Sequence, residues 1–275
     1  MGDQAPGSIA IPLGDEGRAE RLELTGLARG PWRPDAAHGG GPAGLVVRAV
    51  ERHGLEEGMR VASISSTFYG PVLLGEIEIA SEVVKPGRRQ KVVSVTLSCG
   101  GRVAIEAHGV LLRRAEVPLP DGIERIGPPL PAPEDCEPVD RGLWARGDEI
   151  AFHRTANTVM RIQGGPEVLG QMGSAWFRLE YPLLPGEELS AAQRAAAAAD
   201  FGNGLAHPVA FGEYLFANCD LNVSTFRDPA GEWIGLVSRT DVDPVGSGLT
   251  TTDLHDRSGR FGAATQSLYI DRAGD

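Results

Sequence analysis

Three polar residues in the second half of the chain, Asp200, Asn218 and Gln266, have side chains that together could activate a water molecule. A carboxylate can accept a proton from this water as a general base, and two neutral amides can fix the direction of attack. None of the three is a strong nucleophile, and the chain has no GxSxG motif that would expose a serine on a sharp turn. The set therefore suits hydrolysis of a reactive acyl group such as a thioester, and would be weak against an amide.

The acid stands at the end of a segment that is expected to be helical. Residues 191–199 contain seven alanines and follow Ser190, a favourable N-cap residue. Gly202 and Gly204 stop the helix just after Asp200. A negative charge near a helix C-terminus is mildly unfavourable, so its presence there asks for a reason outside the helix. The small alanine side chains would let this helix lie very close to a neighbour.

A second helix is expected at residues 42–53, directly after His38 and the glycines Gly39, Gly40 and Gly41. Such a helix start leaves backbone N–H groups accessible, and these can stabilise an anion or a developing oxyanion. Gly40 and Gly41 are therefore candidate oxyanion donors, and His38 is a candidate substrate-binding residue. A simple tight turn, with a loop histidine that caps the helix, explains the same residues.

Composition limits the classes of function. The 275 residues are 41% hydrophobic and 23% charged, as in a globular protein of one large or two modest domains. The net charge of -11 argues against nucleic acid as a partner, because a phosphate backbone is bound by clustered lysines and arginines. The three cysteines are widely spaced, odd in number and without metal-ligand spacing, so we expect no disulfide framework and no structural zinc site. The proposed chemistry implies no metal and no redox cofactor. With no apolar run near the roughly 20 residues of a membrane span and no signal peptide, we expect a cytoplasmic protein without membrane insertion.

The expected elements occur twice in the same order. The first half has a strand at 18–28, the helix at 42–53, and strands at 61–69, 75–84, 91–99 and 102–112. The second half has strands at 149–162 and 175–181, the alanine helix, and strands at 215–227, 232–240, 250–255 and 262–270. The tripeptide Ser66-Thr67-Phe68 recurs 158 residues later as Ser224-Thr225-Phe226. We interpret the chain as a duplicated α+β unit.

A proline-rich segment separates the two units. Residues 118–140 contain seven prolines, which favour a stiff, extended chain without regular structure. We therefore predict an N-terminal domain at 1–117 that starts with a loose leader at 1–17, a linker at 118–142, and a C-terminal domain at 143–275 that carries the catalytic residues.

Five stretches of the chain together resemble the type II acyl-CoA thioesterases, the double-hotdog family. They are PWRPDAAHGGGPAGLVVRAVE at 31–51, FYGPVLLGEIEI at 68–79, AAAADFGNGL at 196–205, FANCDLNVSTFRDPAGEW at 216–233 and GRFGAATQSLYI at 259–270. The resemblance spans nearly the whole chain apart from the leader and the linker. No single motif is highly specific, but their order and spacing together are fairly specific.

The resemblance implies an α+β double hotdog, in which each half is an antiparallel sheet wrapped around one central helix. It implies hydrolysis of a fatty acyl-CoA to free acid and CoA, a place in fatty acid metabolism, and no cofactor beyond the CoA of the substrate. The family's catalytic Asp and Gln fall on Asp200 and Gln266. Its Thr or Ser falls on Asn218, a departure, although an amide can still hydrogen-bond a water or a carbonyl.

The first half has no matching set of residues, so we expect one active site per chain. This site would lie where the second half meets the glycine-led helix of the first. Hotdog sheets often associate back to back, so a homo-oligomer, a dimer or larger, is plausible by analogy of fold.

Two other functions fit the same residues. A catalytically inactive hotdog protein would bind acyl-CoA or a related acyl ligand without hydrolysis, and its main support is Asn218. A dehydratase of the same fold would need a His/Asp pair at the start of the helix, for which His38 with Asp35 is the candidate.

Overall fold

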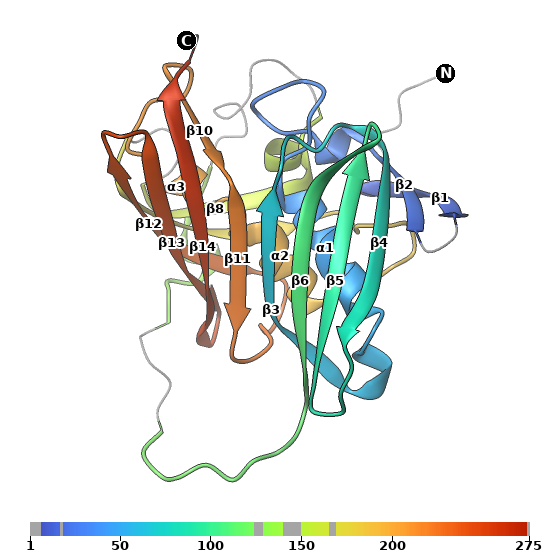
Figure 1. The fold of residues 1–275 in the computed structure, drawn as a ribbon. Coiled ribbons are helices and arrows are strands. Elements are labelled where there is room, and N and C mark those ends of the chain that lie inside the picture. Colours follow the sequence, from blue (N-terminus) through green and yellow to red (C-terminus); the bar gives the residue numbers. More distant parts are fainter. Residues whose placement is uncertain (1–6, 17–18, 124–128, 140–149, 165–168, 274–275) are drawn as a thin grey trace.

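The computed structural model describes residues 7–16, 19–123, 129–139, 150–164 and 169–273. Its strands form one antiparallel sheet in the order β1-β2-β4-β5-β6-β3-β11-β14-β13-β12-β9-β8-β7, with β10 paired to β14 beside this path (Figure 1). The strands are β1 (Ala10–Glu16), β2 (Ala19–Leu24), β3 (Met59–Phe68), β4 (Gly75–Lys85), β5 (Gln90–Cys99), β6 (Arg102–Arg113), β7 (Glu137–Pro138), β8 (Asn157–Gln163), β9 (Met172–Leu179), β10 (Tyr214–Asn218), β11 (Asp220–Thr225), β12 (Ile234–Asp243), β13 (Ser247–Asp256) and β14 (Gly259–Arg272).

The helical elements are few and short. They are the α-helices α1 (Gly40–Glu51), α2 (Ala191–Ala199) and α3 (Gly202–Leu205), the 3-10 turns η1 (Gly26–Ala28), η2 (Leu55–Glu57) and η3 (Pro133–Asp135), and a π-helical turn η4 (Phe152–Ala156). Among the described residues, no helix has both the length and the apolar character needed to cross a membrane.

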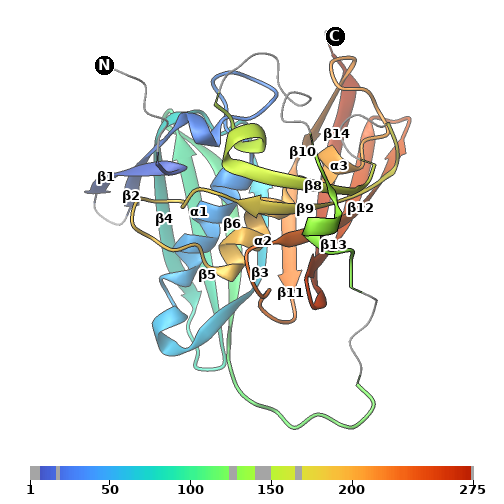
Figure 2. The same cartoon turned by 180° about the vertical axis from the view of Figure 1, so that it is seen from behind.

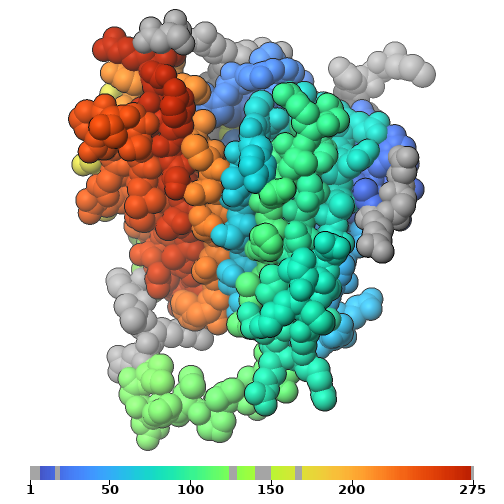
Figure 3. Space-filling model, in the orientation of Figure 1, coloured from blue at the N-terminus to red at the C-terminus, as the bar shows by residue number. Residues whose placement is uncertain are grey.

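The two halves of the chain join edge to edge through β3 and β11. Ser63 pairs with Ser224, and Ser66 pairs with Leu221. At the spacing of 158 residues, Ser224 corresponds to Ser66, and Leu221 corresponds to Ser63. A two-fold axis between the two strands therefore converts one of these pairs into the other. The duplication inferred from the sequence is therefore visible in the register of the central strand pair. In Figure 3 the atoms of the two strands lie side by side along this seam.

The sheet curls around α1 from the first half and α2 from the second, which lie next to each other (Figure 2). Every residue of α1 except Arg48 is buried, so this helix forms the centre of the core. Residues 195–199 of α2 are buried as well. A Cβ on Gly40 would lie only 2.5 Å from the carbonyl oxygen of Ala197. Glycine and alanine thus permit the close helix approach that the sequence predicted.

The N-terminal segment differs from its prediction. Residues 10–16, expected to belong to a loose leader, form β1 and pair with β2. The backbone N–H groups of Ile9 and Ala10 donate to the carbonyls of Pro182 and Leu183, which anchors this segment to the second half of the chain. The alternation of β1 is interrupted by a proline and a glycine, which weakened the strand signal.

The proline-rich segment is also more ordered than predicted. Its last part forms η3 and then β7, a two-residue edge strand on β8. The indole Nε1 of Trp176 donates to the carbonyl oxygen of Pro131 at 2.8 Å. The end of the segment therefore packs onto the second half. The predicted boundary between residues 142 and 143 lies outside the described residues.

The strand predicted at 215–227 is interrupted at Cys219. The preceding part, β10, pairs with β14 alone, whereas β11 lies between β14 and β3. The backbone N–H of Cys219 donates to Ser267, and its carbonyl accepts from Phe68. This break places Asn218 at the end of β10, near the C-terminus of α2.

Candidate active site

Asp200 is the C-cap residue of α2, and only 6% of its side chain is exposed. The Nδ2 of Asn218 donates a hydrogen bond of 2.9 Å to its Oδ1. The Nδ1 of His38, from the loop before α1, lies 2.8 Å from its Oδ2. Residues from both halves of the chain therefore converge on one buried carboxylate.

The helices α1 and α2 are antiparallel, so the C-terminus of α2 faces the N-terminus of α1. Gly39 is the N-cap residue of α1, and a Cβ on it would lie 2.7 Å from Oδ1 and 2.8 Å from Oδ2 of Asp200. The carboxylate thus occupies the space that a side chain at position 39 would need. The unfavourable charge at the end of α2 is offset by the positive end of the α1 dipole.

The imidazole of His38 packs beside two aromatic rings that also contact each other. Its centroid is 5.1 Å from that of Phe152 and 4.4 Å from that of Phe201. Its Nδ1 is also 3.1 Å from the backbone nitrogen of Gly40, a contact in which Nδ1 would have to accept. We assign the proton to Nδ1, because the contact with Asp200 is shorter and an ionised carboxylate can only accept.

This assignment decides which glycine N–H groups are open. The Gly41 N–H already donates to the carbonyl oxygen of His38 at 3.3 Å. With a proton on His38 Nδ1, the Gly40 N–H has no acceptor in that ring. Of the two predicted oxyanion donors, Gly40 is therefore the one without a carbonyl acceptor, but its N–H points at His38 Nδ1, so the ring has to move before an oxyanion can reach it.

Gln266 reaches the backbone of Asp200 rather than its carboxylate. It is 1% exposed, and its Oε1 accepts from the backbone N–H of Asn203 at 3.2 Å. Its Nε2 makes a long contact of 3.4 Å with the carbonyl oxygen of Asp200. A Cβ on Gly202 would lie 2.8 Å from Oε1, so glycine is needed for this approach. In this structure Gln266 thus holds the turn between α2 and α3 that carries Asp200.

Two family descriptions match the sequence. The acyl-CoA thioesterase N-terminal domain matches residues 28–112, and the acyl-CoA thioesterase C-terminal domain matches residues 133–270. The chain belongs to the acyl-CoA thioesterase family. It is therefore a thioester hydrolase by family, and the resemblance found in the sequence is confirmed.

Solved structures share the architecture of this thioesterase over nearly its whole length. A hot dog fold protein of unknown function from Alicyclobacillus acidocaldarius has a TM-score of 0.74 and 18% identity, covering 94% of each chain. Acyl-CoA thioesterase II TesB2 from Mycobacterium marinum has a TM-score of 0.67 and 16% identity, covering 96% of each chain. A comparison with curated proteins gives no match.

A more distant neighbour is the dehydratase domain of RzxB from Pseudomonas fluorescens, with a TM-score of 0.53 and 13% identity, covering 94% of this chain and 96% of that one. At such identities these structures establish the fold alone, and they confirm the predicted double hotdog. Because proteins with different names share the fold, the reaction has to be argued from the site.

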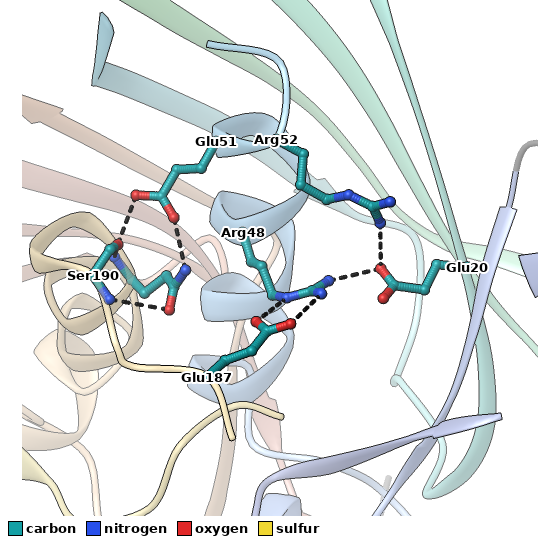
Figure 4. A network of polar contacts seen from close by, with 7 residues as sticks. Glu20, Arg48, Glu51, Arg52, Glu187 and Ser190 are labelled. Carbon is teal, nitrogen blue, oxygen red and sulfur yellow. Dashed lines mark hydrogen bonds and ion pairs between the residues drawn. The ribbon is translucent and has the colours of Figure 1, made fainter. Parts of the chain in front are cut away.

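The opposite end of the helix pair carries a second buried acid. Glu51 ends α1, is 4% exposed, and lies at the N-terminus of α2, as Asp200 lies at that of α1. Its two oxygens accept from Ser190 Oγ at 2.6 Å and from Gln193 Nε2 at 2.7 Å (Figure 4). Ser190 and Gln193 also form the capping box of α2. Glu51 is therefore bound into the N-terminal cap of α2. Its position at one end of the helix pair corresponds to that of Asp200 at the other end.

The pairing of His38 with Asp35, the candidate pair for a dehydratase, is wrong. Asp35 is exposed and forms an ion pair of 2.7 Å with Arg33, whereas His38 contacts Asp200. The rings of Phe152 and Phe201 around His38 were missed as well. The glycines before α1 and the acid after α2 were visible in the sequence, but only the antiparallel contact of the two helices brings them together.

Proposed function

We propose that this thioesterase hydrolyses fatty acyl-CoA to free acid and CoA, with Asp200 as the general base that activates water. The proposal is supported by one observation above all, a buried carboxylate that is held by Asn218 and His38 at the N-terminus of α1. Among the described residues, no serine or cysteine side chain hydrogen-bonds to Asp200 or His38. Direct attack by water therefore fits the site better than a covalent acyl-enzyme.

In the proposed reaction, a water molecule binds to the free lone pairs of the Asp200 carboxylate. As its oxygen bonds to the thioester carbonyl carbon, Asp200 takes a proton from it. The carbonyl oxygen becomes an oxyanion, and the backbone N–H of Gly40 stabilises the developing charge once the His38 ring has moved away from it. The intermediate then collapses, the C–S bond breaks, and the CoA thiolate leaves with the proton held by Asp200. This reaction needs no metal and no redox cofactor.

Asn218 takes the place of the family's Thr or Ser without losing the contact to the base. Its Nδ2 faces Oδ1 of Asp200, because the carboxylate can only accept. The amide oxygen can accept from the attacking water, as a hydroxyl oxygen could, and the amide adds a second N–H that a hydroxyl group lacks. We therefore assign Asn218 the orientation of the water, and we assign Gln266 the positioning of Asp200 through its backbone.

A second candidate reaction is dehydration of a hydroxyacyl thioester. It is favoured by the contact between His38 and Asp200, since an imidazole and a carboxylate side by side can remove one proton and return another. Dehydration releases no thiol and forms a carbon–carbon double bond. The two candidates therefore differ in their products.

The test is release of free thiol from straight-chain acyl-CoAs of short, medium and long chain length. We expect the wild type to release thiol, and we expect Asp200→Asn to lose at least about a hundredfold in kcat, as is typical when a positioned general base is removed. Asp241→Asn is the matched control, because Asp241 is 52% exposed and its carboxylate pairs on the surface with Arg239.

Each outcome has a distinct meaning. No thiol release by the wild type at any chain length would refute hydrolysis of fatty acyl-CoAs, and binding without turnover would favour the inactive alternative. Unchanged activity of Asp200→Asn would refute the role of Asp200. An unsaturated product from 3-hydroxyacyl-CoA, seen by mass spectrometry, would favour the dehydratase.

A further inference from the structure

A cluster of four aromatic side chains adjoins the Asp200 site. The ring of Trp32 stacks on that of Phe211 with centroids 5.1 Å apart, and meets Phe216 edge to face at 5.0 Å. The imidazole of His207 meets Phe211 edge to face at 5.1 Å and lies parallel to Phe216 at 6.2 Å. We call these residues the aromatic cluster.

The aromatic cluster lies close to the proposed reaction centre. Phe216 and Asn218 are two residues apart in β10, so their side chains share one face of that strand. Trp32 belongs to the loop of the first half that leads to His38. The cluster is thus built from both halves of the chain, as the site is.

The cluster extends from the surface into the interior. Trp32 is 43% and Phe211 is 40% exposed, whereas Phe216 and His207 are each only 2% exposed. The two exposed rings, Trp32 and Phe211, thus border the buried Phe216 and His207.

His207 carries a buried polar atom that the described residues leave without a partner. Its Nδ1 lies 3.2 Å from the carbonyl oxygen of Val209. Because a carbonyl can only accept, Nδ1 carries the hydrogen, and Nε2 of the neutral ring is an acceptor. This Nε2 is buried and has no hydrogen bond within the part of the chain that the structure describes. Buried polar atoms in proteins rarely lack a partner, so one is expected when the site is in use.

A water molecule is a poor occupant of this position. A buried water needs two to four polar partners. Here the rings of Phe211 and Phe216 flank the imidazole and offer no hydrogen-bond acceptor or donor to a water. A hydrogen-bond donor that is attached to an apolar chain fits better, because the chain can lie against the rings while its donor reaches Nε2.

We propose that the aromatic cluster is a substrate subsite, in which Nε2 of His207 accepts a hydrogen bond from an O–H or N–H group carried on an apolar chain. In an acyl-CoA this donor is either a hydroxyl group on the acyl chain or an amide N–H of the pantetheine arm. His207 then determines specificity without taking part in the chemistry. This proposal rests on the proposed function and adds a preference among its substrates.

Two variants of His207 separate the two nitrogens of the ring. In His207→Asn the amide nitrogen takes the place of Nδ1, so the bond to Val209 is kept and the acceptor is lost. In His207→Gln the longer side chain brings an amide oxygen near the position of Nε2, so an acceptor is kept. Comparison of the two variants therefore separates the effect of losing the hydrogen-bond acceptor from the effect of losing the imidazole ring.

The measurement is kcat/KM for two pairs of substrates. The first pair is a 3-hydroxyacyl-CoA and the unsubstituted acyl-CoA of equal length, assayed by thiol release. The second pair is the acyl thioester of N-acetylcysteamine, which keeps the amide nearest the sulfur, and that of a simple alkanethiol.

We expect the wild type to favour the donor-bearing member of one pair by about three- to tenfold, the usual effect of one hydrogen bond. His207→Asn should abolish this preference, and His207→Gln should retain part of it, while the other member of the pair is hydrolysed at a similar rate throughout. Loss in the first pair places the acyl hydroxyl at His207, and loss in the second places the amide there. Equal ratios in the wild type and His207→Asn for both pairs would overturn the proposal.

A measurement on the unaltered protein guards against unfolded variants and against failure of the hydrolase assignment. In protein labelled with 15N histidine, a non-hydrolysable S-alkyl-CoA thioether with a hydroxylated chain, and its unsubstituted counterpart, are added to saturation. We expect the Nε2 resonance of His207 to move toward the hydrogen-bonded range with at least one ligand. An unmoved resonance with both saturating ligands would overturn the proposal even if no thioester is hydrolysed.

Discussion

The carboxylate of Asp200 lies where a side chain on Gly39 would have to be, with its two oxygens 2.7 and 2.8 Å from the position of a Cβ at residue 39. Asp200 ends α2 of the second half, and Gly39 caps α1 of the first half. One glycine of the first half is therefore a requirement for the acid of the second. The contact also explains why an acid is tolerated at a helix C-terminus, since it lies at the N-terminus of the neighbouring helix.

Gly39→Ala should impair activity more than stability. The added methyl group would push the carboxylate away from Asn218 and His38, and a displacement of about 1 Å in a catalytic group can cost about a hundredfold in rate. We expect a loss of that order in kcat, with a melting temperature within a few degrees of the wild type. Gly204→Ala is the control, because a Cβ there would meet no atom within 4 Å. Full activity of Gly39→Ala would show that Asp200 need not remain at its present position.

Variants of His38 show which ring nitrogen matters. His38→Asn places an amide donor near the position of Nδ1 and so keeps a contact with Asp200, whereas His38→Phe keeps only a ring that packs beside Phe152 and Phe201. If His38 acts by holding Asp200, the Asn variant should stay within about tenfold of the wild type in kcat, and the Phe variant should lose about a hundredfold. Equal losses in steady-state assays would instead assign the function to Nε2, as in the dehydratase alternative.

Asn218 can be tested against threonine, one of the two residues that the family resemblance leads us to expect at this position. Asn218→Thr keeps a donor toward Asp200 and should retain activity within about tenfold, while the nearly isosteric Asn218→Leu removes it and should lose about a hundredfold in kcat with little change in KM. The measurement is steady-state hydrolysis of the best acyl-CoA. An active Asn218→Leu would contradict the role in orienting water.

Much of the fold was predictable because its local signals agree with its packing. The helix at 191–199 matches α2 in both bounds, because alanines favour the helix and Ser190 with Gln193 forms a capping box. The strands from β3 to β6 lie within two residues of their predicted ranges, because β-branched residues alternate between well-defined turns. The strand β1 was missed, because its stability comes from contacts with β2 and with residues 182–183, which no local pattern reveals.

The site was predictable only in part. The contact between Asn218 and Asp200 agrees with the residue types and the family pattern, since an amide and a carboxylate were expected to share a water. The contact between His38 and Asp200 depends on the antiparallel packing of two helices far apart in the chain, which the sequence does not encode locally. The placement of Gln266 on the backbone of Asp200 depends on the turn into α3, which no sequence pattern predicted.

Glu51 provides a test of the prediction that the chain has one active site. If the end of the helix pair at Glu51 is structural, Glu51→Gln should leave kcat and KM unchanged. The amide can keep both contacts, since its oxygen accepts from Gln193 and its nitrogen donates to Ser190. Halved activity or a second kinetic phase lost in Glu51→Gln would indicate a second site.

The same variant should differ from the wild type in the pH dependence of its stability. Burial raises the pKa of Glu51 above its ordinary value of 4.5, although the hydrogen bonds from Ser190 and Gln193 oppose this shift. The folded protein then binds the proton more tightly than the unfolded chain does, so the contribution of Glu51 to stability is largest below pH 4.5 and declines as the pH rises through the raised pKa. We therefore measure the free energy of unfolding of Glu51→Gln and of the wild type in urea from pH 4 to 8. The value for Glu51→Gln minus that for the wild type should increase as the pH rises. A difference that stays constant over this range would contradict a raised pKa at Glu51.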